Sequence, residues 1–384
     1  MTTTEKPKAG LEDAVVTTSS ICFIDGDRGV LAYSGYDIHD LARQSTFEEV
    51  AFLLWHRRLP TRAELGDLQT QLTAARALPE PVIRLMRALP VGAQSGADSM
   101  DALRTLTSAL AHYDPEVAEN SKEANYRKAV RLTAQLGSLV ATIGRVNSGG
   151  GPIQPDPVLS HAANFLYMLT GERPSGLATR AFDVALILHA DHELNASTFT
   201  ARVAAATLTD LHSAIVGAIG ALKGPLHGGA NADVMRLLLE IGKDAPLEKA
   251  EEIVRGKLAR KEKIPGFGHR VYHTEDPRAT HLRQMSKDLG QRAGQPQWFQ
   301  MSERIETLVK ADKKLNPNVD FYSASTYYVL GIPIELFTPI FAVSRVSGWT
   351  AHVLEQYANN RLIRPRAEYV GPQFPQRYAP LETR

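Results

Sequence analysis

Two histidines and one aspartate lie in turns rich in glycine or asparagine between residues 224 and 322. The histidines occur in Gly-Pro-Leu-His227-Gly-Gly-Ala-Asn and Pro-Gly-Phe-Gly-His269-Arg-Val-Tyr, and the aspartate in Asn-Pro-Asn-Val-Asp320-Phe-Tyr. Glycine lets the main chain approach a ligand closely. Two imidazoles can donate hydrogen bonds on either side of one carboxylate base, as carbon–carbon bond formation from a weak C–H acid requires. We therefore predict that His227, His269 and Asp320 are catalytic.

Each of these residues also has a simpler interpretation. His227 can be a loop histidine bonded to the backbone, and Asp320 precedes an apolar aromatic stretch, where aspartate commonly caps a helix. The arginines that follow His269, including Arg278, can be surface charges on a solvated turn. We favour a cationic pocket for an anionic substrate, because arginine binds carboxylates with two parallel hydrogen bonds.

The segment His189-Ala-Asp191-His192-Glu193 invites a metal-site interpretation, since residues three apart share a helix face. The HExxH arrangement is absent and no third ligand is close in sequence. We therefore predict no metal site, and expect His192 to line a polar pocket. Arg345 and Arg364, taken singly, would be surface charges or cations at helix ends.

Most of the chain has helical periodicity. Residues 47–56, 126–143, 178–194 and 199–222 carry apolar side chains three and four positions apart, and we count a dozen or more such segments. Residues 21–33 alternate around Asp25-Gly-Asp-Arg-Gly29, which predicts one small β-hairpin. The predicted fold is mainly α, all-helical apart from one N-terminal hairpin.

The length of 384 residues favours two domains or one large helical body. Glycine and proline at 224–225 and 331–333 punctuate the chain around a more charged segment. We predict a small inserted helical domain at residues 225–331, with residues 1–224 and 332–384 forming one large domain. The glycine-rich residues 148–157 are either a loop between helices or a domain linker.

Composition excludes several classes of function. Lys plus Arg number 43 and Asp plus Glu 42, so no concentrated positive charge points to nucleic acid or a membrane surface. The single cysteine excludes an internal disulfide and cysteine-based metal sites. Neither a signal segment, nor a membrane-spanning run, nor a GxGxxG or P-loop pattern is visible, so we expect a cytoplasmic protein without those nucleotide-binding turns.

Five ordered motifs together resemble citrate synthase over about residues 11–372. They are His189-Ala-Asp-His-Glu-Leu-Asn-Ala-Ser197, Gly224-Pro-Leu-His227-Gly-Gly-Ala-Asn231, Gly266-Phe-Gly-His-Arg-Val-Tyr272 with Asp276-Pro-Arg278, Asn318-Val-Asp-Phe-Tyr322, and Arg364-Pro-Arg. The resemblance implies a mainly α-helical, two-domain citrate synthase-like fold and a homodimer. It also implies condensation of acetyl-CoA with oxaloacetate and water to give citrate and CoA, with no tightly bound cofactor.

The resemblance further implies a role for each matching residue. Asp320 matches the base that removes a methyl proton from acetyl-CoA, His227 the donor to the enolate oxygen, and His269 the group that polarises the keto carbonyl. His192, Arg278 and Arg345 match oxaloacetate-binding positions, and Arg364 matches the arginine that reaches the site of the partner subunit. The CoA-binding loop corresponds to Ile264, Pro265, Gly266, Phe267 and Gly268.

Three other functions remain open on sequence. A 2-methylcitrate synthase using propionyl-CoA would share the same histidines and aspartate, and one methylene changes preference by only about 1–3 kcal/mol. A non-catalytic acyl-CoA-binding protein is disfavoured because His227 and Asp320 are both present. A metal-dependent hydrolase would require bound zinc and would be sensitive to chelators.

Overall fold

The computed structural model describes residues 9–11, 14–90 and 96–384, and this part of the chain contains sixteen α-helices. The first ten are α1 (Ile38–Gln44), α2 (Phe47–His56), α3 (Arg62–Ala75), α4 (Glu80–Ala88), α5 (Ser99–Leu110), α6 (Lys122–Asn147), α7 (His161–Thr170), α8 (Gly176–His189), α9 (Ala196–Ala205) and α10 (Leu211–Leu222). The last six are α11 (Ala230–Ile241), α12 (Leu247–Ala259), α13 (Pro277–Arg292), α14 (Gln297–Lys313), α15 (Val319–Val329) and α16 (Phe337–Ala358). The predicted mainly α fold is confirmed.

Side-chain caps define where many of these helices begin. Thr46 accepts a hydrogen bond from the Glu49 N–H at the start of α2, and Thr61 with Glu64 forms a capping box at the start of α3. Such caps satisfy amide groups that have no partner inside the helix. The predicted helix over residues 47–56 coincides with α2, and the one over residues 126–143 lies inside α6.

Two helical predictions differ from the structure. Residues 199–222 form two helices, because Asp210 caps a new helix through a hydrogen bond from the Ser213 N–H. The segment predicted over residues 178–194 ends as α8 at His189, and Glu193 beyond it has a left-handed φ of 53°. The turn after α8 therefore presents His192 from outside the helix.

The predicted hairpin is confirmed and gains a third strand. Strands β1 (Cys22–Asp25) and β2 (Val30–Tyr33) pair antiparallel, with Cys22 opposite Tyr33 and Asp25 opposite Val30. The two-residue strand β3 (Tyr36–Asp37) then pairs with β2 in a three-stranded antiparallel sheet. Tyr33 is fully buried, so the sheet is anchored on the helical body.

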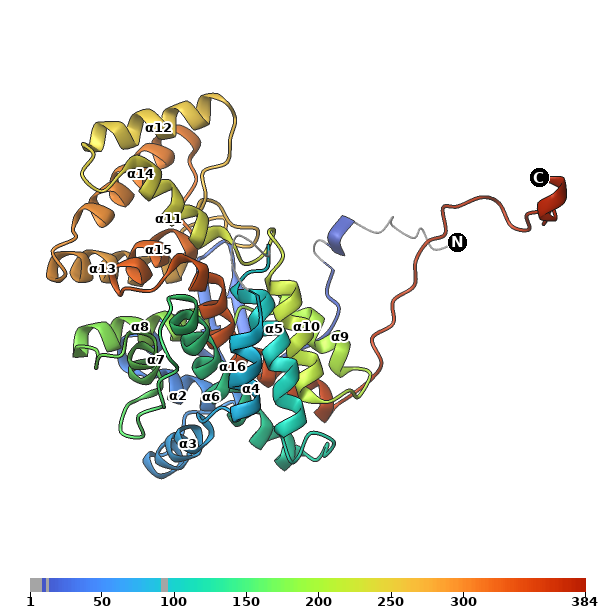
Figure 1. The fold of residues 1–384 in the computed structure, drawn as a ribbon. Coiled ribbons are helices and arrows are strands. Elements are labelled where there is room, and N and C mark those ends of the chain that lie inside the picture. Colours follow the sequence, from blue (N-terminus) through green and yellow to red (C-terminus); the bar gives the residue numbers. More distant parts are fainter. Residues whose placement is uncertain (1–8, 12–13, 91–95) are drawn as a thin grey trace.

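The helices form two groups in space (Figure 1). Helices α11 to α15 lie together at one side, whereas α2 to α10 lie with α16 at the other. Most residues of α16 are buried, including Trp349 and Val346, so this helix forms the axis of the larger group. Residues 148–157 join α6 and α7, which pack on each other, so they form a loop between neighbouring helices. The domain boundaries at residues 225 and 331 stay a prediction.

The chain leaves the helical body after α16. Residues from 361 onward are exposed almost throughout and extend away from the helices, with one short 3₁₀ turn at Leu381–Thr383 (Figure 1). Several apolar side chains on this tail are open to solvent, among them Val370 and Phe374. None of the described helices is both long enough and apolar enough to cross a membrane.

Candidate active site

His227 lies in the turn between α10 and α11 and contacts the first turn of α9. Its Nε2 accepts a hydrogen bond from the Ser197 N–H at 3.2 Å and lies 2.9 Å from Ser197 Oγ. A backbone N–H can only donate, so Nε2 is an acceptor and the ring proton of neutral His227 is on Nδ1. That Nδ1–H has no hydrogen-bond partner among the described residues, so it is available to a ligand.

The surroundings of His227 keep its imidazole neutral. Burial, with a further contribution from the positive charge of Arg345, lowers the pKa of His227 to about 4. Ser197 is the second residue of α9, so the ring also faces amide groups at the positive end of a helix dipole. Trp349 holds Ser197 in place by donating from Nε1 to Ser197 Oγ at 3.1 Å. Sequence analysis gave Ser197 no role, because only the fold brings α9 and α16 to His227.

His269 is fixed in the complementary tautomer by its own loop. The N–H groups of Val271 and Tyr272 both donate to His269 Nδ1, at 2.9 and 3.1 Å. Nδ1 is therefore an acceptor, and the proton of the neutral ring is on Nε2. Burial first, and the Arg278 guanidinium second, lower the pKa of His269 to about 4. His269 thus offers a neutral N–H donor at neutral pH.

Three rings form a cluster between the two helix groups. The ring centroids of His192 and His269 are 5.3 Å apart, and those of His269 and Tyr272 are 4.8 Å apart. His192 Nε2 lies 3.2 Å from the Tyr272 hydroxyl. Burial, reinforced by Arg278, lowers the pKa of His192 well below its usual range. Tyr272 stands in a motif used for the family resemblance, yet sequence reasoning assigned it no role.

Arg278 is buried in a two-bond pair with Asp276. Its Nε donates to Asp276 Oδ1 at 2.9 Å and its Nη2 to Asp276 Oδ2 at 2.8 Å. Asp276 also caps α13 and accepts a hydrogen bond from the Val319 N–H at 3.1 Å, next to Asp320. The Asp276 carboxylate raises the pKa of Arg278 despite its burial. Asp276 therefore fixes both the arginine and the start of α15.

Arg345 is also a buried cation, but its charge is compensated much less than that of Arg278. On α16 its Nε donates to the backbone oxygen of His189 at 2.7 Å, and it makes no ion pair within the described part of the chain. Burial lowers the pKa of Arg345, which Asp191 partly offsets. One turn along α16, a Cβ on Gly348 would overlap the Ala190 oxygen, so the helix packs directly on the turn that carries His192. An anionic ligand would supply the missing counter-charge.

Asp320 is the second residue of α15, and its alternative role as a cap is wrong. The cap is Asn318, whose side chain accepts a hydrogen bond from the Asp320 N–H at 3.0 Å. Removal from water raises the pKa of Asp320 to about 6, although Arg278 and Arg345 oppose the shift. A carboxylate with that pKa is a stronger base than an exposed aspartate and is still ionised at neutral pH.

Residues 264–268 run beside the segment that leads to Asp320. The Gly268 N–H donates to Asn316 O and the Asn318 N–H to Gly266 O, both at 2.9 Å. Gly266 has a φ of 79°, and a Cβ there would press on Val234 and Phe321. The Phe267 ring packs on Phe321 with a centroid distance of 4.6 Å. This loop and the first turn of α15 therefore form one unit.

Shared electrostatic neighbours link the predicted site residues. Arg345 lowers the pKa values of His227 and His192 and also acts on Asp320, while Arg278 acts on His192, His269 and Asp320. The structure does not bring Arg364 to this site within one chain, because Arg364 lies in the exposed tail beyond α16. Arg270 is also exposed and adds nothing to the pocket.

The two histidines of the metal-site alternative turn to different partners. His189 Nδ1 lies 2.7 Å from the Ala185 oxygen inside α8, whereas His192 faces Tyr272. The described residues hold no group of three or more His, Cys, Asp or Glu side chains arranged to bind a metal ion.

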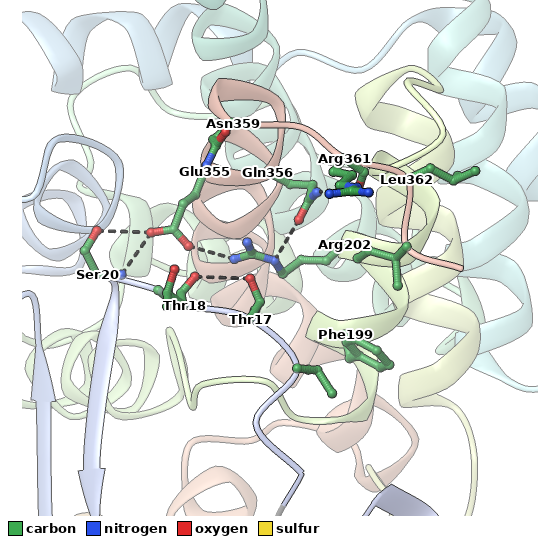
Figure 2. Close-up of a pocket in the computed structure, with 13 residues that line it drawn as sticks. Thr17, Thr18, Ser20, Phe199, Arg202, Glu355, Gln356, Asn359, Arg361 and Leu362 are labelled. Atoms are coloured by element: carbon green, nitrogen blue, oxygen red, sulfur yellow. Dashed lines mark hydrogen bonds and ion pairs between the residues drawn. The ribbon is translucent and has the colours of Figure 1, made fainter. Parts of the chain in front are cut away.

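A separate hollow of about 570 Å³ is linked to the site by hydrogen bonds between buried side chains. Arg202, Glu355 and Gln356 line it between α9, α16 and the segments that lead to both chain ends (Figure 2). Arg202 Nη1 donates to His352 Nδ1 at 3.1 Å, and His352 Nε2 lies 3.4 Å from Asp191 Oδ2. Since arginine only donates, His352 carries its proton on Nε2 and donates to Asp191. This series of hydrogen bonds, from Arg202 through His352 to Asp191, supports the turn that presents His192.

Comparison with known proteins identifies related sequences and structures. The family model described as citrate synthase, C-terminal domain, matches residues 10–366. The chain is 55% identical to citrate synthase 2 of Bacillus subtilis over 98% of both chains, and 42% identical to citrate/2-methylcitrate synthase of the same organism over 95% of this chain and 96% of the relative.

A solved structure extends the likeness to three dimensions. It is the citrate synthase of Thermoplasma acidophilum in ternary complex with carboxymethyl coenzyme A and oxaloacetate, 32% identical, covering 99% of this chain and all of that one, with a TM-score of 0.90. The chain therefore belongs to the citrate synthase family and is an acyltransferase.

Proposed function

We propose that this protein condenses acetyl-CoA with oxaloacetate and water to give citrate and CoA, as a citrate (Si)-synthase. The observation that carries the proposal is the pair of histidines held as neutral donors, His227 through Nδ1 and His269 through Nε2. They accompany a carboxylate with a raised pKa, Asp320. One donor per carbonyl oxygen and one base are what joining an enolate to a ketone requires.

In the first step Asp320 removes a proton from the methyl group of acetyl-CoA. His227 Nδ1–H donates to the thioester oxygen, where negative charge develops. General base catalysis typically raises the rate about 10²- to 10⁴-fold. In other enzymes, removing one hydrogen-bond donor to a developing oxyanion costs about 2.7–4 kcal/mol. Neither group suffices alone, so the base and the donor must act on the same thioester.

In the second step the enolate carbon forms a bond to the keto carbon of oxaloacetate. His269 Nε2–H donates to the keto oxygen, which becomes the hydroxyl of citryl-CoA when it takes up a proton. Water then attacks the thioester carbonyl and releases citrate and CoA. Arg345, Arg278 and His192 bind the carboxylates of the keto acid; Arg345 contributes most of the charge, because Asp276 already neutralises Arg278.

Residues 264–268 are proposed to hold CoA, because this loop is hydrogen-bonded to the segment that positions Asp320. A CoA analogue bound to the Thermoplasma relative supports a CoA thioester as substrate. We also propose that residues 225–331 form a small domain and that residues 1–224 with 332–384 form the large one, so that both helix groups contribute to the site.

Arg364 is proposed to reach the site of a second copy in a homodimer. Its place on an exposed tail that extends from the body supports this assignment. We expect Arg364→Ala and Asp320→Asn proteins to be nearly inactive separately. Refolding them together should restore up to about a quarter of wild-type activity, because some mixed dimers keep one intact site. Activity that stays at the level of the separate variants would contradict the assignment.

A thiol-release assay on the wild-type protein tests the function directly. With oxaloacetate present, acetyl-CoA should give the higher kcat/KM. A clear preference for propionyl-CoA would instead identify a 2-methylcitrate synthase, an activity named for a relative that is 42% identical. CoA release that does not depend on oxaloacetate would reject both functions.

A further inference from the structure

The turn between β1 and β2 lies directly on the loop that carries His269. The His273 N–H donates to the Gly26 backbone oxygen at 3.0 Å. A Cβ on Gly26 would overlap the Val271 oxygen, and one on Gly29 would lie 2.9 Å from both Glu275 O and Thr274 Cγ2. The hairpin turn and the loop therefore touch through their main chains.

This contact acts on the peptide groups that orient His269. Val271 and Tyr272 supply the two N–H groups that fix the His269 tautomer. The Val271 carbonyl packs on Gly26, and the next residue but one, His273, bonds to Gly26. The hairpin turn thus constrains the chain on both sides of Tyr272, whose hydroxyl faces His192.

The opposite end of the same hairpin holds the turn that carries His192. The Tyr33 hydroxyl, buried at the end of β2, lies 3.1 Å from Ile187 O and 3.0 Å from Asp191 O. One short sheet therefore contacts both segments from which the three-ring cluster is built. These segments are about 80 residues apart in sequence and belong to different helix groups.

We propose that the β1–β2 hairpin is a positioning element of the active site, which holds the His269–Tyr272 loop against His192 so that His269 Nε2–H meets the keto carbonyl. The proposal rests on the function proposed above. Gly26 is its main positioning residue, because no larger side chain allows the Val271 carbonyl to approach. The hairpin acts through His269 and Tyr272.

Glycine at position 26 is required by this contact and not by the turn itself. Gly26 lies outside the left-handed region, so alanine is compatible with its backbone, whereas Gly29 has a φ of 64°. The side-chain pair between Asp27 and His273 is largely exposed, with 83% and 73% of the side-chain surfaces open. Such a pair contributes little, so the main-chain contact carries the effect.

The first test is Gly26→Ala, with Gly66→Ala as its control. Gly66 lies in α3, and a Cβ there meets no atom within 4 Å. In Gly26→Ala the KM for oxaloacetate should rise at least tenfold and kcat should fall, while the KM for acetyl-CoA stays within twofold. General damage to the fold would instead lower kcat and leave both KM values unchanged, and that result would overturn the proposal.

Hydrogen–deuterium exchange gives a readout that does not depend on activity. Without substrates, amides in residues 269–276 should exchange at least tenfold faster in Gly26→Ala than in wild type, while those of α16 stay unchanged. Unchanged exchange in residues 269–276 would overturn the proposal even if activity fell. If wild-type protein makes no citrate, the proposed function fails, but the exchange experiment still decides whether the hairpin holds the loop.

A second matched pair covers the case in which Gly26→Ala does not fold. Asparagine tolerates left-handed backbone, so Gly29→Asn preserves the turn but pushes on Thr274 and Glu275. Gly35→Asn places the same residue in the next turn of the sheet, at a φ of 88° and with no atom within 4 Å. We expect a higher KM for oxaloacetate and faster exchange only in Gly29→Asn. Equal behaviour of the two variants would reject the proposal.

Discussion

The two histidines that we propose as donors are held in opposite ways. The tautomer of His269 is set by amides two and three residues further along its own loop. That of His227 is set by Ser197, which lies thirty residues earlier and is fixed in turn by Trp349 on α16. A local motif therefore sets the tautomer of His269, whereas the tautomer of His227 depends on three helices packing correctly. The tautomer of His227 should therefore be more sensitive than that of His269 to changes in distant packing.

The largest effect is expected from removing Asp320, the proposed base. Asp320→Asn should lower kcat by about 10²- to 10⁴-fold and leave oxaloacetate binding nearly unchanged, because we propose that the keto acid binds on the His269 side. Equilibrium binding and thiol release measure the two quantities. A parallel loss of oxaloacetate affinity would show that the two halves of the site are not separable.

The same variant should be more stable than wild type. The pKa of Asp320 is raised to about 6 in the folded protein, so the fold holds this proton more tightly than the unfolded chain does. Stability therefore falls as pH rises from about 4 to 6, and the cost persists above pH 6, at up to about 3 kcal/mol. At pH 7 the midpoint of thermal unfolding should rise in Asp320→Asn, and a lower midpoint would contradict the burial argument.

The next largest effect is expected from pH. Protonation of Asp320 should make kcat/KM for acetyl-CoA fall below about pH 6, approaching tenfold per pH unit. His227 and His269, with pKa values near 4, remain neutral over this range and should add no second step until about pH 4. Initial rates between pH 4.5 and 8 test this. A decrease in kcat/KM approaching a hundredfold per pH unit just below pH 6, which requires two protons, would contradict it.

A smaller effect is expected from the support of His227. Ser197→Ala removes the hydroxyl that lies 2.9 Å from His227 Nε2 and 2.7 Å from Asn195 Oδ1, but it keeps the backbone N–H that donates to Nε2, so kcat should fall about twofold to tenfold. Ser302→Ala is a suitable control, because that buried hydroxyl bonds only to the Trp298 oxygen within α14. Activity as high in Ser197→Ala as in the control would mean that Ser197 Oγ does not support the donor.

The smallest effect on kcat is expected from Tyr272→Phe, on the His269 side. Tyr272→Phe removes the hydroxyl 3.2 Å from His192 Nε2 but retains the Tyr272 N–H that donates to His269. The KM for oxaloacetate should rise about twofold to tenfold, as for the loss of one hydrogen bond, and kcat should change little. Tyr328→Phe, whose ring packs on Trp298, serves as the control. A larger loss of kcat than in Ser197→Ala would reverse the comparison between the two halves.

Periodicity predicted the helical fold because most helices have one clear apolar face, and α2 was predicted to the residue. It merged α9 with α10 because both are rich in small apolar residues, although residues 206–210, which include left-handed Leu208 and the Asp210 cap, separate them. Strand β3 was missed because two residues carry no alternation. Its pairing is defined by β2, which is a tertiary contact.

The site was predictable where chemistry and turn residues coincide. His227, His269 and Asp320 stood out because glycine or asparagine surrounds each of them, and these three stay predictions until the variants are measured. Ser197 and His352 did not stand out, because their partners, His227 and Asp191, are 30 and 161 residues away. Asp276 carried a local signal, since it immediately precedes Pro277 at a helix start and Arg278 follows, but that signal was read only as part of a family motif.

The buried Arg345 has a thermodynamic consequence for the empty protein. Its guanidinium has been taken out of water, and apart from one backbone oxygen it finds little in exchange. A small dianion that binds there supplies the missing negative charge. Because it binds only the folded protein, it raises the free energy of unfolding by about 2.7 kcal/mol when its concentration is a hundred times its dissociation constant. The midpoint of thermal unfolding should therefore rise as the site near Arg345 becomes occupied. Dicarboxylates should raise it more than monocarboxylates of equal size.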